Sequence, residues 1–368
     1  MIWSHGAVPS PRSETPMATR QWPLQGGVIK EKDLNMHAEF ELVCIGSRRR
    51  WLVALALFVA TSLVSTQGAV AEDEPGFTRQ EDVVYGRKYG TALTLDVFRP
   101  KHDANGAAVV LAVSGGFFSS HEAINPALLL PLLNRGFTVF AVVHGSQPRF
   151  TVPEIVEDMN RALRFIRHHA ADYGIDPMRI GITGASAGGH LSLMIGTNGQ
   201  AGRPDARDPV DRESSRVQAV ACFFPPTDLL NWDRPGAERI RATDHDPKYR
   251  PAFDHRHLDE KTALWVPITD LERLRQIARD ISPIYHVSPD DPPTLMIHGD
   301  ADTVVPVRQA QTMAEALKKA GVETKLIIKP GAGHGWLGLY RDLDDLVDWF
   351  EHHLKKPDST QAKSPGAE

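Results

Sequence analysis

Short apolar runs alternate with amphipathic stretches from about residue 82 almost to the end of the chain. Short, nearly continuous apolar runs are typical of strands that are buried on both faces of a parallel sheet. The pattern predicts strands at 83–90, 91–98, 107–116, 137–145, 178–184, 216–225, 293–299 and 324–331. We expect the first two to form an antiparallel pair across a glycine turn.

Helical periodicity separates these runs. Residues 152–174 carry apolar side chains at intervals of three and four, which indicates an amphipathic helix. Further helices are predicted at 126–136, 187–196, 305–321 and 343–356. Alternation of strands and helices favours an α/β fold, with a mostly parallel central sheet and helices on both of its faces.

One long stretch breaks the alternation. Residues 199–290 are polar, rich in Pro, Asp and Arg, and include a short helical piece at 269–280. Most connections within compact domains are far shorter than this. We therefore expect a single domain over 72–368, with a cap inserted at about 199–290 that covers the carboxyl edge of the sheet.

The first 71 residues have the pattern of a leader. Arginines at 48–50 precede an apolar run at 51–64, and Ala69 and Ala71 form an A-x-A cleavage pattern. This order is typical of a secretory signal peptide, and the run is shorter than the roughly 20 residues of a membrane span. The sequence predicts a secreted or periplasmic protein without a membrane span in its mature form. Met36 is an alternative start.

Composition narrows the function only slightly. The chain has 368 residues, of which 42% are hydrophobic, and its formal net charge is −5. A negative balance gives no electrostatic footprint for nucleic acid. Cys44 and Cys222 are the two cysteines, so no disulfide framework is expected.

A cluster of small residues surrounds Ser186, where an expected strand ends and a helix begins. The sequence at 184–188 is GASAG. A phosphate-binding turn is one interpretation, but no lysine follows the glycines and the motif lies in the middle of the chain. A nucleophilic serine on a tight turn fits better, because G-x-S-x-G between a strand and a helix is the context that this motif requires.

A base and an acid follow Ser186 in the order that such a nucleophile needs. Asp302 comes just after the strand at 293–299, and His334 just after the strand at 324–331. We expect His334 to act as the base and Asp302 to orient it. Asp300 is the competing acid, and we favour a loop-stabilising role for it.

Two groups of backbone N–H are expected to bind the oxyanion that would form when the serine attacks a carbonyl group. Ala187 follows the nucleophile at the start of the helix. Gly115 and Gly116 lie in the loop after the strand at 107–113, where glycine lets the backbone approach a substrate.

Together these stretches resemble the α/β-hydrolase esterase and lipase group with an HGG-type oxyanion loop, including feruloyl- and acetyl-esterase-like proteins. More distantly they resemble the catalytic domain of prolyl-oligopeptidase-type peptidases. The matching stretches are SGGF at 114–117, ED at 157–158, YGIDPMRIGITGASAGGHL at 173–191, HGDADTVVP at 298–306 and GAGHGW at 331–336. The chain departs from this group at Ser114, where a histidine is usual, and at 144–146.

The resemblance implies a serine hydrolase that cleaves small or polymer-linked carboxylic esters through an acyl-enzyme, without a cofactor, and the leader pattern predicts that it is secreted. A serine peptidase of prolyl-oligopeptidase type and a non-catalytic binding protein are the alternatives. Phe117 and Trp336 are candidate substrate-binding residues, although both could simply pack the core. Three histidines at 244–260 admit a metal hypothesis, but we favour a solvated cap surface and expect no metal.

Overall fold

The computed structural model describes residues 76–356. The predicted signal peptide, its cleavage after Ala71, the alternative start at Met36 and the segment after residue 356 lie outside the described residues. Within 76–356, none of the helices combines the length and the hydropathy that a bilayer span requires.

An eight-stranded sheet forms the centre of the fold, in the order β1-β2-β4-β3-β5-β6-β9-β10. Its strands are β1 (Phe77–Lys88), β2 (Thr91–Pro100), β3 (Ala108–Val113), β4 (Thr138–Val143), β5 (Ile180–Ala185), β6 (Ala219–Phe223), β9 (Thr294–Gly299) and β10 (Thr324–Lys329). β2 pairs antiparallel with both β1 and β4, and the other pairs are parallel.

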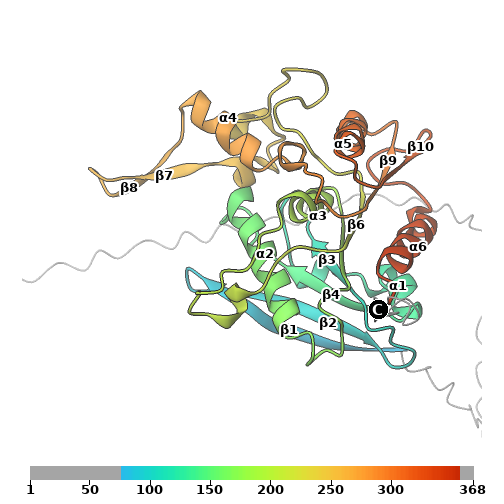
Figure 1. Cartoon of the computed structure of the whole chain (residues 1–368). Helices are drawn as coiled ribbons and strands as arrows, with labels where there is room; N and C mark the ends of the chain where they lie inside the picture. The colour runs from blue at the N-terminus through green and yellow to red at the C-terminus, as the bar shows by residue number, and fades with distance from the viewer. Residues whose placement is uncertain (1–75, 357–368) are drawn as a thin grey trace, which may run out of the picture. The chain divides into compact units, whose positions relative to one another are not determined.

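Helices cover both faces of this sheet (Figure 1). The helices are α1 (Leu130–Asn134), α2 (Val152–His168), α3 (Ala187–Asn198), α4 (Leu271–Asp280), α5 (Arg308–Lys319) and α6 (Leu343–His353). Buried side chains of α2, α3 and α5 belong to one apolar cluster, and those of α1 and α6 to a second on the opposite face. The predicted α/β class, with its mostly parallel sheet, is confirmed.

The helix expected at 126–136 is shorter than predicted. A 3-10 turn at Pro126–Leu128 precedes α1, and Pro131 lies in the first turn of α1. Proline has no N–H to donate within a helix, so it favours the start of a helix over its interior. The two prolines therefore divide the predicted helix into two pieces.

The cap begins later in the chain than predicted. Residues 219–223 form β6, which pairs with β5 and β9 inside the sheet, because this short run is entirely apolar and buried. The insertion over the carboxyl edge therefore follows β6. It contains α4 and a two-stranded hairpin that the sequence analysis missed, β7 (Arg256–Asp259) and β8 (Leu264–Pro267).

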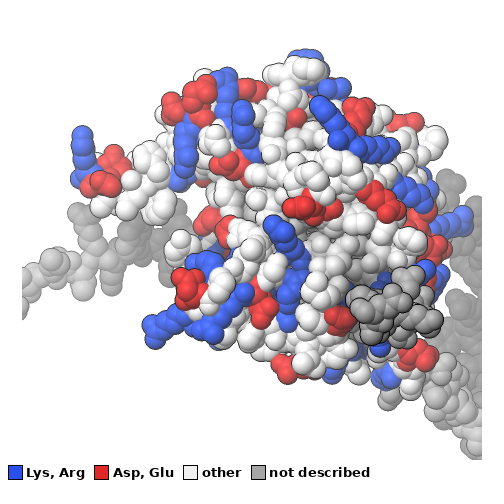
Figure 2. Space-filling view, in the orientation of Figure 1, with Lys and Arg blue, Asp and Glu red and all other residues white. Residues whose placement is uncertain are grey.

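The hairpin extends away from the sheet, at the left of Figure 1. Basic and acidic side chains are interspersed over the face of the molecule that Figure 2 shows, without a region of one sign. Strands β3, β4, β5, β9 and β10 all run in the same direction. The loops that follow them therefore all lie at the carboxyl edge of the sheet. That edge carries the candidate site.

Candidate active site

Ser186 lies on a strained turn between β5 and α3. Its φ and ψ angles are 55° and −118°, a conformation that L-residues rarely adopt. The turn is tight because strand and helix cross closely: a Cβ atom on Gly184 would lie 2.5 Å from the carbonyl oxygen of Gly188. A Cβ atom on Gly188 would lie 2.5 Å from the carbonyl oxygen of Ala112. Both glycines of the motif are thus required sterically.

The structure brings Ser186, His334 and Asp302 together. The Ser186 Oγ lies 2.8 Å from Nε2 of His334, and Nδ1 of His334 lies 2.7 Å from Oδ2 of Asp302. Because a carboxylate only accepts, Nδ1 of His334 carries the proton and donates it to Asp302. Nε2 is then left to accept the Ser186 hydroxyl proton, which is the arrangement that general-base activation of serine requires.

Asp302 is almost completely buried, and three hydrogen-bond donors and the ring of His298 surround its carboxylate. Oδ1 accepts the N–H groups of Val304 and Val305 at 2.8 and 2.9 Å, and Oδ2 faces His298 at 3.3 Å as well as His334. Burial alone would raise the pKa of Asp302, but the contacts with His298, His334 and the Val305 N–H hold it well below its usual range. The carboxylate is therefore ionised when it faces His334.

Asp300, the competing acid, does not contact His334. Its Oδ1 accepts the N–H of Gly331, and its side chain is exposed. Asp300 thus ties the loop after β9 to the loop after β10.

The backbone N–H groups near Ser186 that have no backbone acceptor within residues 76–356 differ from the predicted set. The N–H of Gly115 donates to the carbonyl of Phe118 at 2.9 Å, so it is not free to bind an oxyanion, which corrects the expectation for Gly115. Gly116 and Phe117 both have positive φ angles, 56° and 65°, as in the tight turns that close hairpins. The N–H groups of Gly116, Phe117 and Ala187 donate to no other backbone group among residues 76–356.

The oxyanion loop is braced from the end of β4. His144 is buried, its Nδ1 donates to the carbonyl of Gly145, and its Nε2 lies 2.9 Å from Oγ of Ser114. Burial, more than any other factor, lowers the pKa of His144 to about 4, so Nε2 is an acceptor for the Ser114 hydroxyl. The carbonyl of Ser114 in turn accepts the N–H of Gly188 at 3.3 Å. The two positions that depart from the resembled group therefore bond to each other.

Gln147 was not identified from the sequence, yet it contacts both the oxyanion loop and the cap. Its side-chain Nε2 donates to the carbonyls of Gly116 at 2.8 Å and Lys248 at 3.0 Å. Its backbone N–H donates to the carbonyl of Phe117. A single glutamine in an otherwise polar loop carries no sequence signal for this role.

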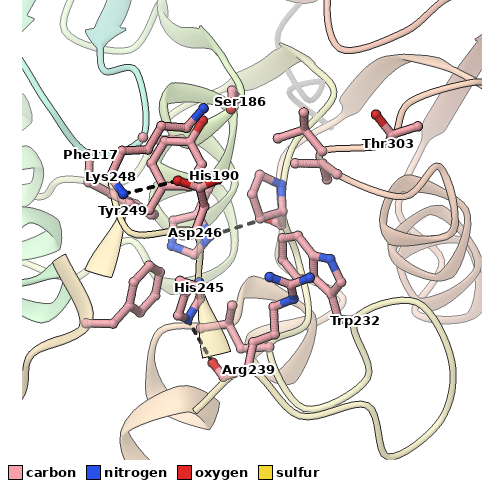
Figure 3. Close-up of a pocket in the computed structure, with 17 residues that line it drawn as sticks. Phe117, Ser186, His190, Trp232, Arg239, His245, Asp246, Lys248, Tyr249 and Thr303 are labelled. Atoms are coloured by element: carbon pink, nitrogen blue, oxygen red, sulfur yellow. Dashed lines mark hydrogen bonds between the residues drawn. The ribbon is translucent and has the colours of Figure 1, made fainter. Parts of the chain in front are cut away.

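A pocket of about 290 Å³ opens beside Ser186 (Figure 3). Its walls are both apolar and polar, and it is lined by Gly116, Phe117, Ser186, Ala187, His190, Pro226, Leu229, Trp232, Arg239, His245, Asp246, Lys248, Tyr249, Phe253, Thr303, Val304 and Val305. Most of the wall opposite the sheet comes from the cap. A Cβ atom on Gly116 would lie 2.3 Å from the ring of Tyr249, so the cap packs directly on the oxyanion loop.

The structure places the two predicted substrate-binding aromatic residues in different surroundings. Phe117 lines the pocket and packs edge-on against the rings of His190 and Phe253. Trp336 is not among the lining residues. Its ring packs near Phe224, and its Nε1 donates to Oδ2 of Asp342 at 2.7 Å, so it supports the loop that carries His334.

The two histidines that line the pocket are neutral near pH 7. Burial, more than any other factor, lowers the pKa of His190 and of His245 to about 4. Nδ1 of His190 donates to the carbonyl of Pro226 at 3.3 Å, which leaves Nε2 as an acceptor with no partner within residues 76–356.

Histidines of the cap do not gather into a metal site. His255 is buried against Phe253 and His257 is exposed, and within residues 76–356 neither belongs to a group with metal-ligand spacing. The one such group in this part of the chain is Glu323, His352 and His353. It lies at the amino end of β10, the end opposite His334.

The sequence was compared with protein families and with characterised proteins, and both comparisons point to esterases. The model of the family described as BD-FAE matches residues 95–317, which is more than half of the chain. A probable carboxylic ester hydrolase of Mycobacterium tuberculosis, LipM, is 32% identical over 247 residues, covering 66% of this chain and 52% of that protein. The chain therefore spans about half the length of this relative.

Two of the solved structures with a similar fold are described as esterases. The truncated form of a carbohydrate esterase from gut microbiota has a TM-score of 0.60 and 28% identity, covering 77% of this chain and 99% of that one. A thermophilic esterase from the Planctomycetes species Thermogutta terrifontis has a TM-score of 0.56 and 27% identity, covering 77% and 95%.

Proposed function

Because this chain belongs to the BD-FAE family of α/β-hydrolase esterases, we propose that it hydrolyses carboxylic esters through an acyl-enzyme. Ser186 is the nucleophile, His334 is the base and Asp302 orients His334. The observation that carries this proposal is the chain of contacts from Ser186 Oγ through His334 to Asp302, at 2.8 and 2.7 Å, with the base nitrogen facing the serine.

In the acylation step the Ser186 Oγ attacks the ester carbonyl while Nε2 of His334 removes its proton. The imidazolium that forms is stabilised by the Asp302 carboxylate, which stays ionised because its pKa is lowered by its donors. His334 then passes the proton to the leaving alcohol. Water repeats the sequence on the acyl-enzyme and releases the acid.

The negative charge that develops on the carbonyl oxygen needs preorganised donors. The N–H of Ala187 lies at the N-terminus of α3, where the helix dipole also favours an anion. The N–H groups of Gly116 and Phe117, which donate to no backbone group within residues 76–356, are the partners from the oxyanion loop. Removing one such donor typically costs about 3 kcal/mol of transition-state stabilisation.

The test is turnover of p-nitrophenyl esters of increasing acyl length by the wild type and by Ser186→Ala. We expect a burst of p-nitrophenol equal to the enzyme concentration and a mass increase equal to the acyl group in the wild type, and neither in Ser186→Ala. Ser214→Ala, remote from the pocket, is the matched control. Full activity in Ser186→Ala would overturn the mechanism.

A peptide anilide tests the peptidase alternative in the same assay. Amides and esters use the same triad, so the ratio of the two rates, rather than the presence of the triad, decides the reaction class. We expect ester turnover to exceed anilide turnover, and the reverse result would assign the protein to the peptidases.

We also propose that the substrate is a small or polymer-linked ester met after export. The leader pattern at 48–71 supports export, and the opening of the pocket beside Ser186 supports access by a substituent on a larger molecule. N-terminal sequencing of protein recovered from the medium or periplasm tests this: a mature chain that starts at Glu72 is expected, and a chain that retains the leader contradicts it.

A further inference from the structure

Arg239 lines the same pocket as Ser186 but at its other end. Figure 3 shows Ser186 at the top of the close-up and Arg239 below it, with the Arg239 guanidinium beside the ring of Trp232. The pocket thus has a reactive hydroxyl at one end and a guanidinium at the other. With a volume of about 290 Å³, near the lower limit for small-molecule sites, a short molecule would span it.

The guanidinium of Arg239 is held in place without a counter-ion. Its Nη1 donates to the backbone carbonyl of Asp244 at 3.0 Å, and its central carbon lies 4.7 Å from the centroid of the Trp232 ring. No carboxylate within residues 76–356 lies within ion-pair distance of it. Nε and Nη2, which share one edge of the guanidinium plane, donate to no other group in this part of the chain.

The other charges of the pocket do not neutralise Arg239. Asp246 and Lys248 lie two residues apart, and Oδ1 of Asp246 accepts the backbone N–H of Lys248. The proximity of Asp246 helps to raise the pKa of Lys248, after the larger contribution of Tyr249. His245 and His190 are neutral, for the reason given above. The pocket therefore contains two cations, Lys248 and Arg239, but one carboxylate, that of Asp246. Of the two cations, Arg239 has a guanidinium edge that is not used in a hydrogen bond within residues 76–356.

An unpaired arginine edge in a partly apolar pocket matches one ligand chemistry better than others. A guanidinium edge donates two parallel hydrogen bonds, and a carboxylate accepts both. Stacking on Trp232 keeps the plane of the guanidinium fixed, so little side-chain entropy remains to be lost on binding. A neutral ester in the pocket would cover the Arg239 guanidinium without accepting its hydrogen bonds, and burying an unpaired charged group is unfavourable.

We propose that the pocket takes an ester whose far end, remote from the scissile bond, carries a carboxylate that binds Arg239. The protein would then be selective for short anionic esters, such as the half-esters of dicarboxylic acids or acylated hydroxy acids. This inference rests on the proposed ester hydrolysis at Ser186 and adds the substrate class.

Two matched pairs of esters test it, one for each side of the scissile bond. Monomethyl succinate is compared with methyl butyrate, and 3-acetoxypropionate with propyl acetate, by kcat/KM at low ionic strength. The informative quantity is the anionic-to-neutral ratio within each pair. Comparing this ratio between variants removes the intrinsic reactivity of the esters.

In Arg239→Gln, the ratio should fall about tenfold or more in the pair whose carboxylate occupies the pocket, since hydrogen bonds to charged groups contribute on this scale. Arg239→Lys should retain part of the preference, because the charge remains while the bidentate edge is lost. Arg241→Gln, an exposed arginine on the same segment outside the pocket lining, should leave both ratios unchanged. Added salt should lower the wild-type preference.

Binding of a product analogue gives a readout that does not depend on turnover. Succinate should inhibit hydrolysis of a neutral ester competitively, with an inhibition constant that rises about tenfold in Arg239→Gln. An unchanged ratio in both pairs, together with an unchanged inhibition constant, would overturn this inference while the esterase proposal stands. Absence of turnover of every ester by the wild type would overturn both.

Discussion

The carboxyl edge of the sheet, which carries the candidate site, and the cap that faces it are built in different ways. At the edge, Ser186, Asp302 and His334 each follow a strand, and backbone strain, glycine contacts and buried hydrogen bonds fix their positions. In the cap, between β6 and β9, one hairpin and one α-helix are joined by short 3-10 turns. Many of its ion pairs lie on the surface, where such pairs contribute little to stability.

From this difference we expect the sheet edge to carry out the reaction and the cap to select the substrate. The elements at the sheet edge can orient a nucleophile and donors with little freedom, because moving one of them requires moving a strand. The cap supplies most of the pocket wall, including Trp232 and Arg239, from segments held by side chains. We therefore expect changes at the edge to reduce turnover of every substrate, and changes in the cap to alter stability and preference.

Asp302→Asn should have the largest effect. The amide would donate toward His334 instead of accepting from it, which forces the proton onto Nε2 and leaves no base facing Ser186. We expect kcat to fall on the order of 10⁴-fold, as the same exchange does in a Ser-His-Asp triad. Asp300→Asn is the matched control, since Asp300 contacts Gly331 and not His334. Equal losses in the two variants would contradict the assignment of the acid.

Gln309 holds the first residues of the cap against α5 through hydrogen bonds. Replacing it therefore tests how firmly the cap is anchored to the rest of the fold. The side chain is fully buried on α5; its Oε1 accepts the N–H groups of Thr227 and Asp228, and its Nε2 donates to the carbonyls of Asp228, Asn231 and Trp232.

Gln309→Met keeps the length of the side chain but leaves these backbone groups unpaired. We expect the free energy of unfolding to fall by about 3 kcal/mol, measured with urea. Gln276→Met, on an exposed part of α4, is the control. A loss below 1 kcal/mol would show that solvent replaces these contacts and that the cap is not anchored there.

The sequence predicted the edge much better than the cap, for a physical reason. Strand periodicity and the small residues around Ser186 are local signals, and they located the three side chains, Ser186, Asp302 and His334, that the structure brings together. The pairing of His144 with Ser114 was visible only as two departures from the resembled group. It became a contact once β3 and β4 were neighbours.

The cap lacked such signals. Its start was placed at 199 because a polar segment precedes the short strand β6, and the β7–β8 hairpin was missed because its strands have four residues each. Gln147, Tyr249 and Arg239 reach the site through tertiary contacts that no periodicity encodes. Gly115 was predicted to donate to the oxyanion because the sequence does not show which N–H of a glycine pair is already hydrogen-bonded within the turn.

Acidification should weaken the cap through His255. Burial, more than any other factor, lowers its pKa to about 4 from 6.5. Between these values the unfolded chain binds a proton that the folded chain does not, so the free energy of unfolding decreases as pH falls from 7.5 to 5.

His255→Phe should reduce this decrease by about 2 kcal/mol, because phenylalanine binds no proton in either the folded or the unfolded chain. Within residues 76–356 the His255 ring forms no hydrogen bond that phenylalanine would lose. Urea unfolding at the two pH values measures it. His257→Phe, two residues further along in β7 and exposed, controls for the substitution itself. An identical pH dependence in the wild type and His255→Phe would show that His255 is solvated in the folded protein.

Gln147 joins the two regions and gives the smallest predicted effect. Its Nε2 holds the carbonyl of Gly116 and, at the same time, the carbonyl of Lys248 in the cap. Gln147→Met removes both bonds without changing the length of the side chain. The peptide between Gly116 and Phe117 would then be free to rotate, and with it the N–H of Phe117.

We expect kcat for short neutral esters to fall about tenfold, equivalent to one charge-assisted hydrogen bond lost in the transition state. KM should change much less, because the ground-state carbonyl relies less on these donors than the oxyanion does. A rise in KM with unchanged kcat would instead mean that Gln147 supports the cap wall alone. In that case the oxyanion loop is positioned by the His144–Ser114 contact, and the sheet edge does not depend on the cap.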